Sequence, residues 1–234
     1  MNEQQKILII EDEESIRTGL IDVFVYHGYS VHSCDNGSDG LTQALSGNFN
    51  LIILDIMLPG IDGFEICERI RQTDRSQPVI MLTAKNSEDE IIQGLKLGAD
   101  DYVSKPFSVA QLVLRVEAVL RRSTSQEAPV TRIELDDNLS IDTENLSANG
   151  THGEVTFTKK EMEVLQYLAA HSSRPVPRTE LLSHVWGYGE NLDIETRTVD
   201  IHIAKLRRKI ETNPKDPINL VTVRGAGYRL KVSS

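Results

Sequence analysis

Three short runs of apolar residues constrain the first half of this chain more than any other feature. They are Lys6–Ile10, Leu51–Leu54 and Val79–Leu82, and each is followed by a polar or acidic side chain. Each run is apolar on both faces, which is the pattern of parallel strands covered by helices on both sides. Five predicted strands alternating with five predicted helices indicate a doubly wound α/β domain with a five-stranded parallel sheet. The two weaker strands are expected at 29–34 and 101–104, and the helices at 14–27, 37–46, 63–72, 88–97 and 108–121.

Several of the predicted helices begin with a capping box, in which Ser or Thr is followed three residues later by Glu or Gln. Two such pairs lie in the first half of the chain and one in the second. They are Ser87 with Glu90, Ser108 with Gln111, and Thr158 with Glu161. We therefore expect a helix to begin at each of these three points.

The pattern changes after residue 122. Residues 123–130 are small and polar and include a proline, which is typical of a linker. Short alternating segments follow, with Asn149-Gly150 as a hairpin signal. Helical patterns then start at Thr158 and recur near 178–186 and 195–211, before a final hairpin over 220–230. The chain is thus predicted to hold an α/β domain over 1–122, a linker over 123–130 and an α+β domain over 131–234.

Charge is distributed unevenly along a chain whose formal net charge is −10. Residues 1–122 hold 11 Lys and Arg against 19 Asp and Glu, whereas residues 194–234 hold 9 against 4. A net anion is repelled by phosphate, so the whole chain is a poor general polyanion binder, but the asymmetry predicts two modules with different partners.

The composition also predicts where the protein works. No apolar run approaches the roughly 20 residues of a membrane span, and no secretory signal is visible at the start, so we expect a cytoplasmic protein without a membrane partner. Its two cysteines, Cys34 and Cys67, form no close motif. They are expected to be reduced thiols.

Polar side chains follow the ends of the predicted strands in the first domain. Glu11 and Asp12 follow the first strand, Asp55 the third, Thr83 the fourth and Lys105 the fifth. Ligands of open α/β sheets bind at the carboxyl ends of the strands, so these groups should meet. Crowded carboxylates repel one another, and Mg²⁺, which prefers oxygen ligands, removes that repulsion. An aspartate beside a lysine and a hydroxyl can accept a phosphoryl group as an acyl phosphate.

The segments around these residues resemble the receiver domain of bacterial two-component response regulators. The resemblance rests on residues 9–13, 55–63, 82–84 and 98–107, and it spans residues 5–122. It implies that Asp55 accepts a phosphoryl group from a sensor histidine kinase and that Lys105 pairs with the phosphoryl oxygens. It also implies a magnesium ion held by Glu11, Asp12, Asp55 and the backbone carbonyl of Met57.

The same resemblance implies a conformational switch. Thr83 would turn toward the phosphoryl group, and Tyr102 would swing inward to fill the vacated space. The Lys105–Pro106 peptide bond is expected to be cis. An Asp nucleophile after a strand also occurs in phosphatases of the haloacid-dehalogenase type. Those enzymes need a second Asp two residues later as a general acid, and Met57 stands there, so a hydrolytic enzyme is not predicted.

A dimer is implied by charged residues near the last strand and helix of the first domain. Arg115 and Arg122 lie seven residues apart on one helical face, and Asp100 and Asp101 precede the neighbouring strand. In the resembled family such residues pair across a symmetric dimer, Asp101 with Arg115 and Asp100 with Arg122. The alternative is a solvated surface with weak ion pairs.

The predicted helix over 195–211 has two distinct faces. Val199, Ile203, Leu206 and Ile210 form an apolar stripe. The opposite face is expected to combine basic side chains with the small or apolar Ile201 and Ala204, which suit contact with thymine methyl groups in a major groove. A short helix before it and a hairpin after it complete a winged helix-turn-helix.

This half resembles the OmpR/PhoB winged-helix family over residues 131–232. The resemblance implies that the helix enters the major groove of double-stranded DNA while Arg224 reaches the minor groove. Thr198, His202 and Arg207 would contact phosphates, and a half-buried His202 is the alternative. The full set of expected DNA-binding residues is Arg197, Thr198, Ile201, His202, Ala204, Lys205, Arg207, Arg208, Thr222 and Arg224. The loop Gly187–Asp193 is where family members meet RNA polymerase.

Together these features predict a transcription regulator that is phosphorylated on Asp55, dimerises and binds promoter DNA. The alternative is a winged-helix DNA-binding or architectural protein that works without phosphorylation. Such a protein would not need the complete set of Glu11, Asp12, Asp55, Thr83 and Lys105.

Overall fold

The computed structural model describes residues 4–84, 88–122, 131–135, 139–150, 153–188 and 197–233. The chain separates into two compact units, Met1–Ser123 and Thr124–Ser234. The predicted linker, residues 123–130, lies outside the described residues.

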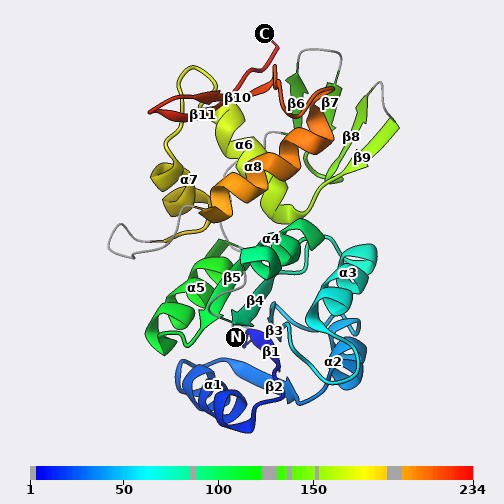
Figure 1. Ribbon diagram of the computed structural model, residues 1–234, viewed down its shortest axis with the longest axis vertical. Coiled ribbons are helices and arrows are strands. Elements are labelled where there is room, and N and C mark those ends of the chain that lie inside the picture. The colour runs from blue at the N-terminus through cyan, green and yellow to red at the C-terminus, as the bar shows by residue number, and fades with distance from the viewer. Residues whose placement is uncertain are drawn as a thin grey trace. The chain divides into compact units, whose positions relative to one another are not determined.

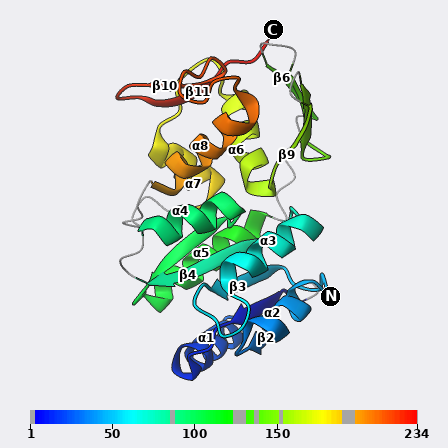
Figure 2. The ribbon, with the colours of Figure 1, turned by 45° about the vertical axis from the view of Figure 1, so that its right-hand side comes forward.

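The first unit is built on a five-stranded parallel sheet with the strand order β2-β1-β3-β4-β5. Helices cover both faces, with α1 and α5 packed together on one side and α2, α3 and α4 in succession on the other (Figures 1 and 2). The predicted α/β architecture is therefore confirmed. The strands are β1 (Lys6–Ile10), β2 (Ser30–Cys34), β3 (Leu51–Asp55), β4 (Val79–Ala84) and β5 (Asp101–Lys105), and the helices are α1 (Glu14–Tyr26), α2 (Gly37–Ala44), α3 (Gly63–Thr73), α4 (Glu88–Leu97) and α5 (Val109–Arg122).

The core of this unit follows from the apolar runs. Residues 7–10 of β1 and 51–54 of β3 are fully buried, because helices cover the sheet on both faces. Phe24 of α1 and Leu112 of α5 pack in one apolar cluster with Ile7, Ile9, Leu51 and Ile53. Burying each large apolar side chain contributes about 1.5–3 kcal/mol, so the central strands anchor the positions of the polar groups that follow them.

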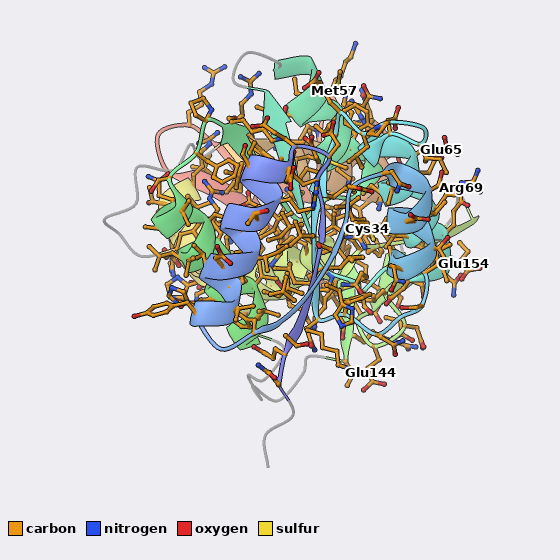
Figure 3. The ribbon with its side chains drawn as sticks, turned by 90° about the horizontal axis from the view of Figure 1, so that it is seen from below. Cys34, Met57, Glu65, Arg69, Glu144 and Glu154 are labelled. Atoms are coloured by element: carbon orange, nitrogen blue, oxygen red, sulfur yellow. The ribbon has the colours of Figure 1, made fainter. Side chains whose placement is uncertain are left out.

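Several helices of this unit begin at a side-chain cap. Asp62 precedes α3 and accepts a hydrogen bond from the backbone N–H of Glu65 at 2.8 Å. On the exposed surface of the same helix, Glu65 pairs with Arg69 at 2.7 Å (Figure 3). Ser108 accepts from the N–H of Gln111 at 3.4 Å, as its capping box predicted. Ser87 lies outside the described residues.

Within its described residues, the second unit begins with a four-stranded antiparallel sheet and continues with three helices and a two-stranded hairpin (Figure 1). This is the predicted α+β arrangement. Its strands are β6 (Arg132–Leu135), β7 (Leu139–Asp142), β8 (Ser147–Gly150), β9 (Gly153–Thr156), β10 (Leu220–Val223) and β11 (Gly227–Leu230), and its helices are α6 (Lys159–Ala170), α7 (Arg178–Val185) and α8 (Arg197–Ile210).

Two local predictions in this unit have different outcomes. The capping box at α6 is present in both directions, with Thr158 and Glu161 each bonding the other's backbone N–H. The hairpin signal Asn149-Gly150 was placed too early, because both residues belong to β8 and Gly150 pairs with Gly153 of β9. The pattern identified the hairpin but not its register, since a strand can carry Asn and Gly near its end.

The hairpin β10–β11 is tied to the helices by its backbone. Val176 and Tyr228 exchange hydrogen bonds at 2.7 and 3.0 Å. Gly227 has φ +117°, and a Cβ there would lie 2.0 Å from the carbonyl oxygen of Val176. Only glycine fits this close approach, which fixes the start of β11 against the segment between α6 and α7. No helix in the described part of the chain is long and apolar enough to cross a membrane.

Candidate functional site

Three carboxylates meet at the carboxyl ends of the first and third strands. The parallel register aligns Ile10 with Leu54, so Glu11 and Asp55 emerge side by side. With Asp12 they form a cluster in which one carboxylate oxygen from each lies within 4.8 Å of the others. Glu11 and Asp55 are buried, whereas Asp12 is exposed. The cluster is the one that the sequence predicted.

Lys105 joins this cluster from the end of β5. Its Nζ lies 2.8 Å from a carboxylate oxygen of Glu11 and 3.0 Å from Oδ2 of Asp55. Burial acts to lower the pKa of Lys105, but its hydrogen bond to Glu11 and the charge of Asp55 outweigh that effect, and the pKa is raised. Lys105 is therefore a permanent cation beside both buried carboxylates. The peptide bond that follows it is cis, as expected.

The donor set fits a divalent cation. Burial, followed by the nearby charge of Asp55, raises the pKa of Glu11 despite its hydrogen bond to Lys105. One lysine thus compensates two buried carboxylates incompletely, and a hard cation would relieve the remaining repulsion. Three oxygen-bearing side chains, of which Asp12 is exposed to solvent, match the preference of Mg²⁺ for oxygen ligands.

Arg17 positions the acidic pair, Glu11 and Asp12, and was not predicted from the sequence. Its Nη1 donates to the backbone carbonyls of Glu11 at 2.8 Å and Asp12 at 3.0 Å. One guanidinium thus holds the two consecutive peptides that carry two of the cluster's carboxylates. In the sequence, Arg17 is an arginine near the start of the helix that follows the two acids. A charge pattern alone does not distinguish such an arginine from one that is exposed to solvent.

The chain after Asp55 is held close to the cluster. Asp55 Oδ1 accepts from the N–H of Ile56 at 2.8 Å. Gly63 begins α3 against this segment, and a Cβ there would lie 2.2 Å from the carbonyl oxygen of Asp55. Met57 is 67% exposed and labelled in Figure 3, so the position two residues after Asp55 is open to solvent.

Thr83 and Tyr102, the predicted switch pair, lie together. Both are buried, and with Glu90 and Ile91 of α4 they line one small enclosed pocket. The hydroxyl of Thr83 donates to Oε2 of Glu90 at 2.9 Å. Tyr102 is therefore already inward in this structure, and the Thr83 hydroxyl is bonded to helix α4.

The predicted dimer contacts are engaged within the chain instead. Arg115 pairs with Asp101, which is fully buried. Asp100 is also buried and accepts from Arg71 Nη2 at 3.0 Å and from the N–H of Val79 at 2.8 Å. Both carboxylates face inward in the single chain, and their pairing across a dimer stays a prediction. The side chain of Arg122 lies outside the described residues.

Helix α8 buries its apolar stripe as predicted, together with three residues that were expected to contact DNA. Thr198 and His202 are buried beside the stripe, and the His202 ring stacks edge-on against Trp186 with centroids 5.1 Å apart. Lys205 is 7% exposed and pairs with Glu161 at 2.9 Å. The prediction that these three side chains contact DNA does not fit their burial. The half-buried alternative for His202 is also too weak, since the ring is fully buried.

The remaining predicted DNA contacts divide into exposed and held groups. Ala204 and Arg208 are exposed, Arg197 and Ile201 are half-buried, and Thr222 and Arg224 are exposed on the hairpin. Arg207 is different, because its Nε donates to the carbonyl of Leu220 at 2.8 Å and its Nη2 donates to Thr222 Oγ1 at 2.7 Å. It therefore joins α8 to β10.

A polar network also links α7, α8 and β11. Arg178 donates to Asp200 at 2.6 Å and to the hydroxyl of Tyr228 at 2.8 Å, and that hydroxyl donates to Asp200 at 2.6 Å. These residues fix the hairpin beside the exposed face of α8, and the sequence analysis did not single them out. Most of the predicted polymerase loop, residues 189–193, lies outside the described residues.

Two family descriptions match the chain. Residues 7–117 match the family described as "Response regulator receiver domain", and residues 152–230 match "Transcriptional regulatory protein, C terminal". These matches cover the two units separately; the first includes Glu11, Asp12, Asp55 and Lys105, and the second includes all of α8 and the β10–β11 hairpin.

Full-length relatives share both units. The chain is 42% identical to the alkaline phosphatase synthesis transcriptional regulatory protein PhoP of Bacillus subtilis, across 97% of each chain. It is 38% identical to the transcriptional regulatory protein ResD of the same organism, across 99% of this chain and 98% of that one. Among solved structures it resembles DrrB of Thermotoga maritima, described as an OmpR/PhoB homolog, with TM-score 0.52, 30% identity and coverage of 98% and 100%.

Proposed function

Because the chain belongs to the OmpR/PhoB family of two-component response regulators, we propose that phosphoryl transfer to Asp55 switches on its binding to promoter DNA. Members of this family are transcription regulators and not enzymes. The observation that carries the proposal is the meeting of Glu11, Asp12, Asp55 and Lys105 at one edge of the sheet.

The cluster supplies the groups that phosphoryl transfer needs. A carboxylate oxygen of Asp55 attacks the phosphorus of a phosphohistidine on the kinase, the P–N bond breaks, and an acyl phosphate forms. Lys105 already lies 3.0 Å from Asp55 and would pair with a phosphoryl oxygen. Glu11, Asp12, Asp55 and the backbone carbonyl of Met57 would hold Mg²⁺, which when bound neutralises charge on the phosphoryl oxygens.

The switch would pass through Thr83. Its hydroxyl bonds Glu90 in this structure, so a turn toward the phosphoryl group exchanges one acceptor for another. Tyr102 lines the same pocket, so a movement of Thr83 would alter the packing of Tyr102 and thereby the surface formed by β5 and α5. Such a rearrangement is a two-state device biased by a local charge.

The switch would act on assembly. We propose that phosphorylation favours a homodimer through the α4–β5–α5 face, on which Leu114 is 45% exposed and Val109 40% exposed. Arg115 already pairs with Asp101 within the chain. To pair with a carboxylate across the interface, it would have to exchange the Asp101 of its own chain for that of the partner. A dimer places two winged-helix units on adjacent DNA sites and couples two modest affinities. A sensor histidine kinase and RNA polymerase complete the proposed partners, and DNA binding implies a cytoplasmic location.

The proposal is tested with the full chain and beryllofluoride, a stable mimic of the phosphoryl group, in the presence of Mg²⁺. DNA affinity is measured by fluorescence anisotropy on the duplex that the beryllofluoride-loaded protein selects from a random pool. We expect beryllofluoride to raise the affinity for DNA on the order of 10- to 100-fold, because the phosphorylation site and the DNA-binding surface would be coupled in free energy. Equal affinity with and without beryllofluoride would favour the phosphorylation-independent DNA-binding protein instead.

The wing has its own prediction. Arg224→Ala should weaken DNA binding by about tenfold and flatten any preference for A·T pairs, because exposed arginine is attracted into a narrow minor groove. Lys231→Ala removes the same charge at the other end of the hairpin, beyond β11, and should have little effect. Unchanged affinity and preference in Arg224→Ala would remove the wing from the contact surface.

A further inference from the structure

Glu161 holds two lysines of α8 inside the winged-helix unit. Its carboxylate is fully buried, with Lys205 Nζ at 2.9 Å from Oε1 and Lys209 Nζ at 2.5 Å from Oε2. The second oxygen also accepts from the N–H of Thr158 at 2.9 Å. Lys209 donates in addition to the carbonyl of Thr156 at 2.9 Å. The two lysines are therefore structural partners of a carboxylate on α6.

This pairing works against a DNA contact by Lys205. To reach a phosphate or a base, Lys205 would have to leave the buried carboxylate of Glu161. That carboxylate would then be paired with Lys209 alone. Removing one partner from a buried charge is strongly unfavourable, whereas one phosphate contact at the surface returns little. The low pKa of Glu161, about 2, agrees with this pairing. Burial raises that pKa, but the charges of Lys205 and Lys209 and the hydrogen bonds from Lys209 and the Thr158 N–H lower it by more.

The outward stripe of α8 is then defined by four residues at helical spacing. Arg197 and Arg208 lie at its two ends, with Ile201 and Ala204 between them. Ala204 and Arg208 are exposed and Ile201 is half-buried. With Lys205 turned to Glu161, the centre of this stripe carries only apolar side chains.

We propose that Glu161 withholds Lys205 from DNA, so that the centre of α8 recognises thymine methyl groups through Ile201 and Ala204. The inference rests on the proposed DNA-binding function and assigns its specificity. Arg197 and Arg208 supply charge at the ends of the stripe, and Glu161 is a positioning residue that acts through Lys205. Apolar side chains reach the thymine C5 methyl in the major groove but offer no hydrogen bond to guanine or adenine.

The first test measures the salt dependence of binding by the beryllofluoride-loaded full chain on the selected duplex. Each lysine or arginine that neutralises a phosphate contributes about 0.9 to the slope of log affinity against log salt concentration. Lys205→Met should keep the wild-type slope, and its affinity should stay within about twofold. Arg208→Ala removes an exposed charge from the same helix and should lower the slope by about 0.9. Lys205→Gln, which can still donate to Glu161, replaces Lys205→Met if that variant does not fold.

The second test uses the wild-type chain and replaces each thymine of the same duplex by uracil, which lacks only the methyl group. At the positions read by Ile201 we expect affinity to fall about fourfold per methyl, and the penalty should disappear in Ile201→Ala. A slope lowered in Lys205→Met as much as in Arg208→Ala would overturn the proposal, and so would a duplex that tolerates uracil throughout. A wild-type chain that shows no salt-dependent binding would contradict the proposed function itself.

Discussion

Asp55→Asn should abolish covalent labelling of the full chain by radiolabelled acetyl phosphate with Mg²⁺. The amide nitrogen replaces the anionic oxygen that attacks phosphorus, and Lys105 loses the carboxylate oxygen that lies 3.0 Å away. Losing the nucleophile removes the reaction rather than slowing it, so the expected effect is loss of all detectable label. Beryllofluoride should then no longer tighten DNA binding, although binding in its absence should persist.

A matched control separates this role from a general effect of charge. Asp35 follows β2 at the same edge of the sheet and lies outside the carboxylate cluster. Asp35→Asn should label like the wild-type chain. Chelation of Mg²⁺ by EDTA should abolish labelling of the wild type, because three carboxylates and one lysine leave the site short of positive charge. Persistent labelling of Asp55→Asn would move the acceptor elsewhere.

The receiver site could be predicted from the sequence because its chemistry depends on strand ends. A continuous apolar run indicates a buried parallel strand. The residues that follow such runs lie together at the carboxyl edge of the sheet. Glu11, Asp55 and Thr83 follow such runs and Lys105 follows a weaker strand pattern, so their meeting could be predicted without knowledge of side-chain packing. Arg17 was missed because it acts on backbone carbonyls, which leave no mark in the sequence.

The ion pairs could not be predicted for a related reason. Asp100 pairs with Arg71 and Lys205 with Glu161, and each pair joins residues far apart in the sequence. A helical wheel shows which face of a helix is apolar, but it does not show how much of the adjoining surface a neighbouring helix buries. Thr198, His202 and Lys205 lie on one flank of α8, about 70–130° from the centre of its apolar stripe. That flank is where Glu161 and Trp186 pack, so charged and polar residues there are buried.

Burial of His202 leads to the second large prediction, which concerns stability against acid. Its Nδ1 donates to the carbonyl of Thr198 at 2.9 Å, and the ring is fully buried against Trp186. Burial disfavours the charged form, so the ring is neutral in the folded chain. Burial, and then the charge of Lys205, lower the pKa of His202 to about 3, while Glu161 raises it in part and Lys160 lowers it. The unfolded chain therefore takes up this proton near pH 6.5 and the folded chain does not. Stability of the winged-helix unit should fall as the pH drops below 6.5 and continue to fall toward 3.

The size and assignment of this effect are measurable in the full chain. One proton taken up only by the unfolded state changes the free energy of unfolding by about 1.4 kcal/mol per pH unit. The chain has one tryptophan, Trp186, and it packs against His202, so its fluorescence during urea unfolding reports this unit alone. The pKa of Glu161 is lowered from 4.5 to about 2, so its contribution is complete above 4.5 and is lost only below that pH. Between pH 4.5 and 6.5, His202→Gln should therefore show a slope smaller than the wild type by about 1 kcal/mol per pH unit. Equal slopes in the two proteins would mean that His202 is protonated in the folded chain, and the burial of its ring against Trp186 would then have to be wrong.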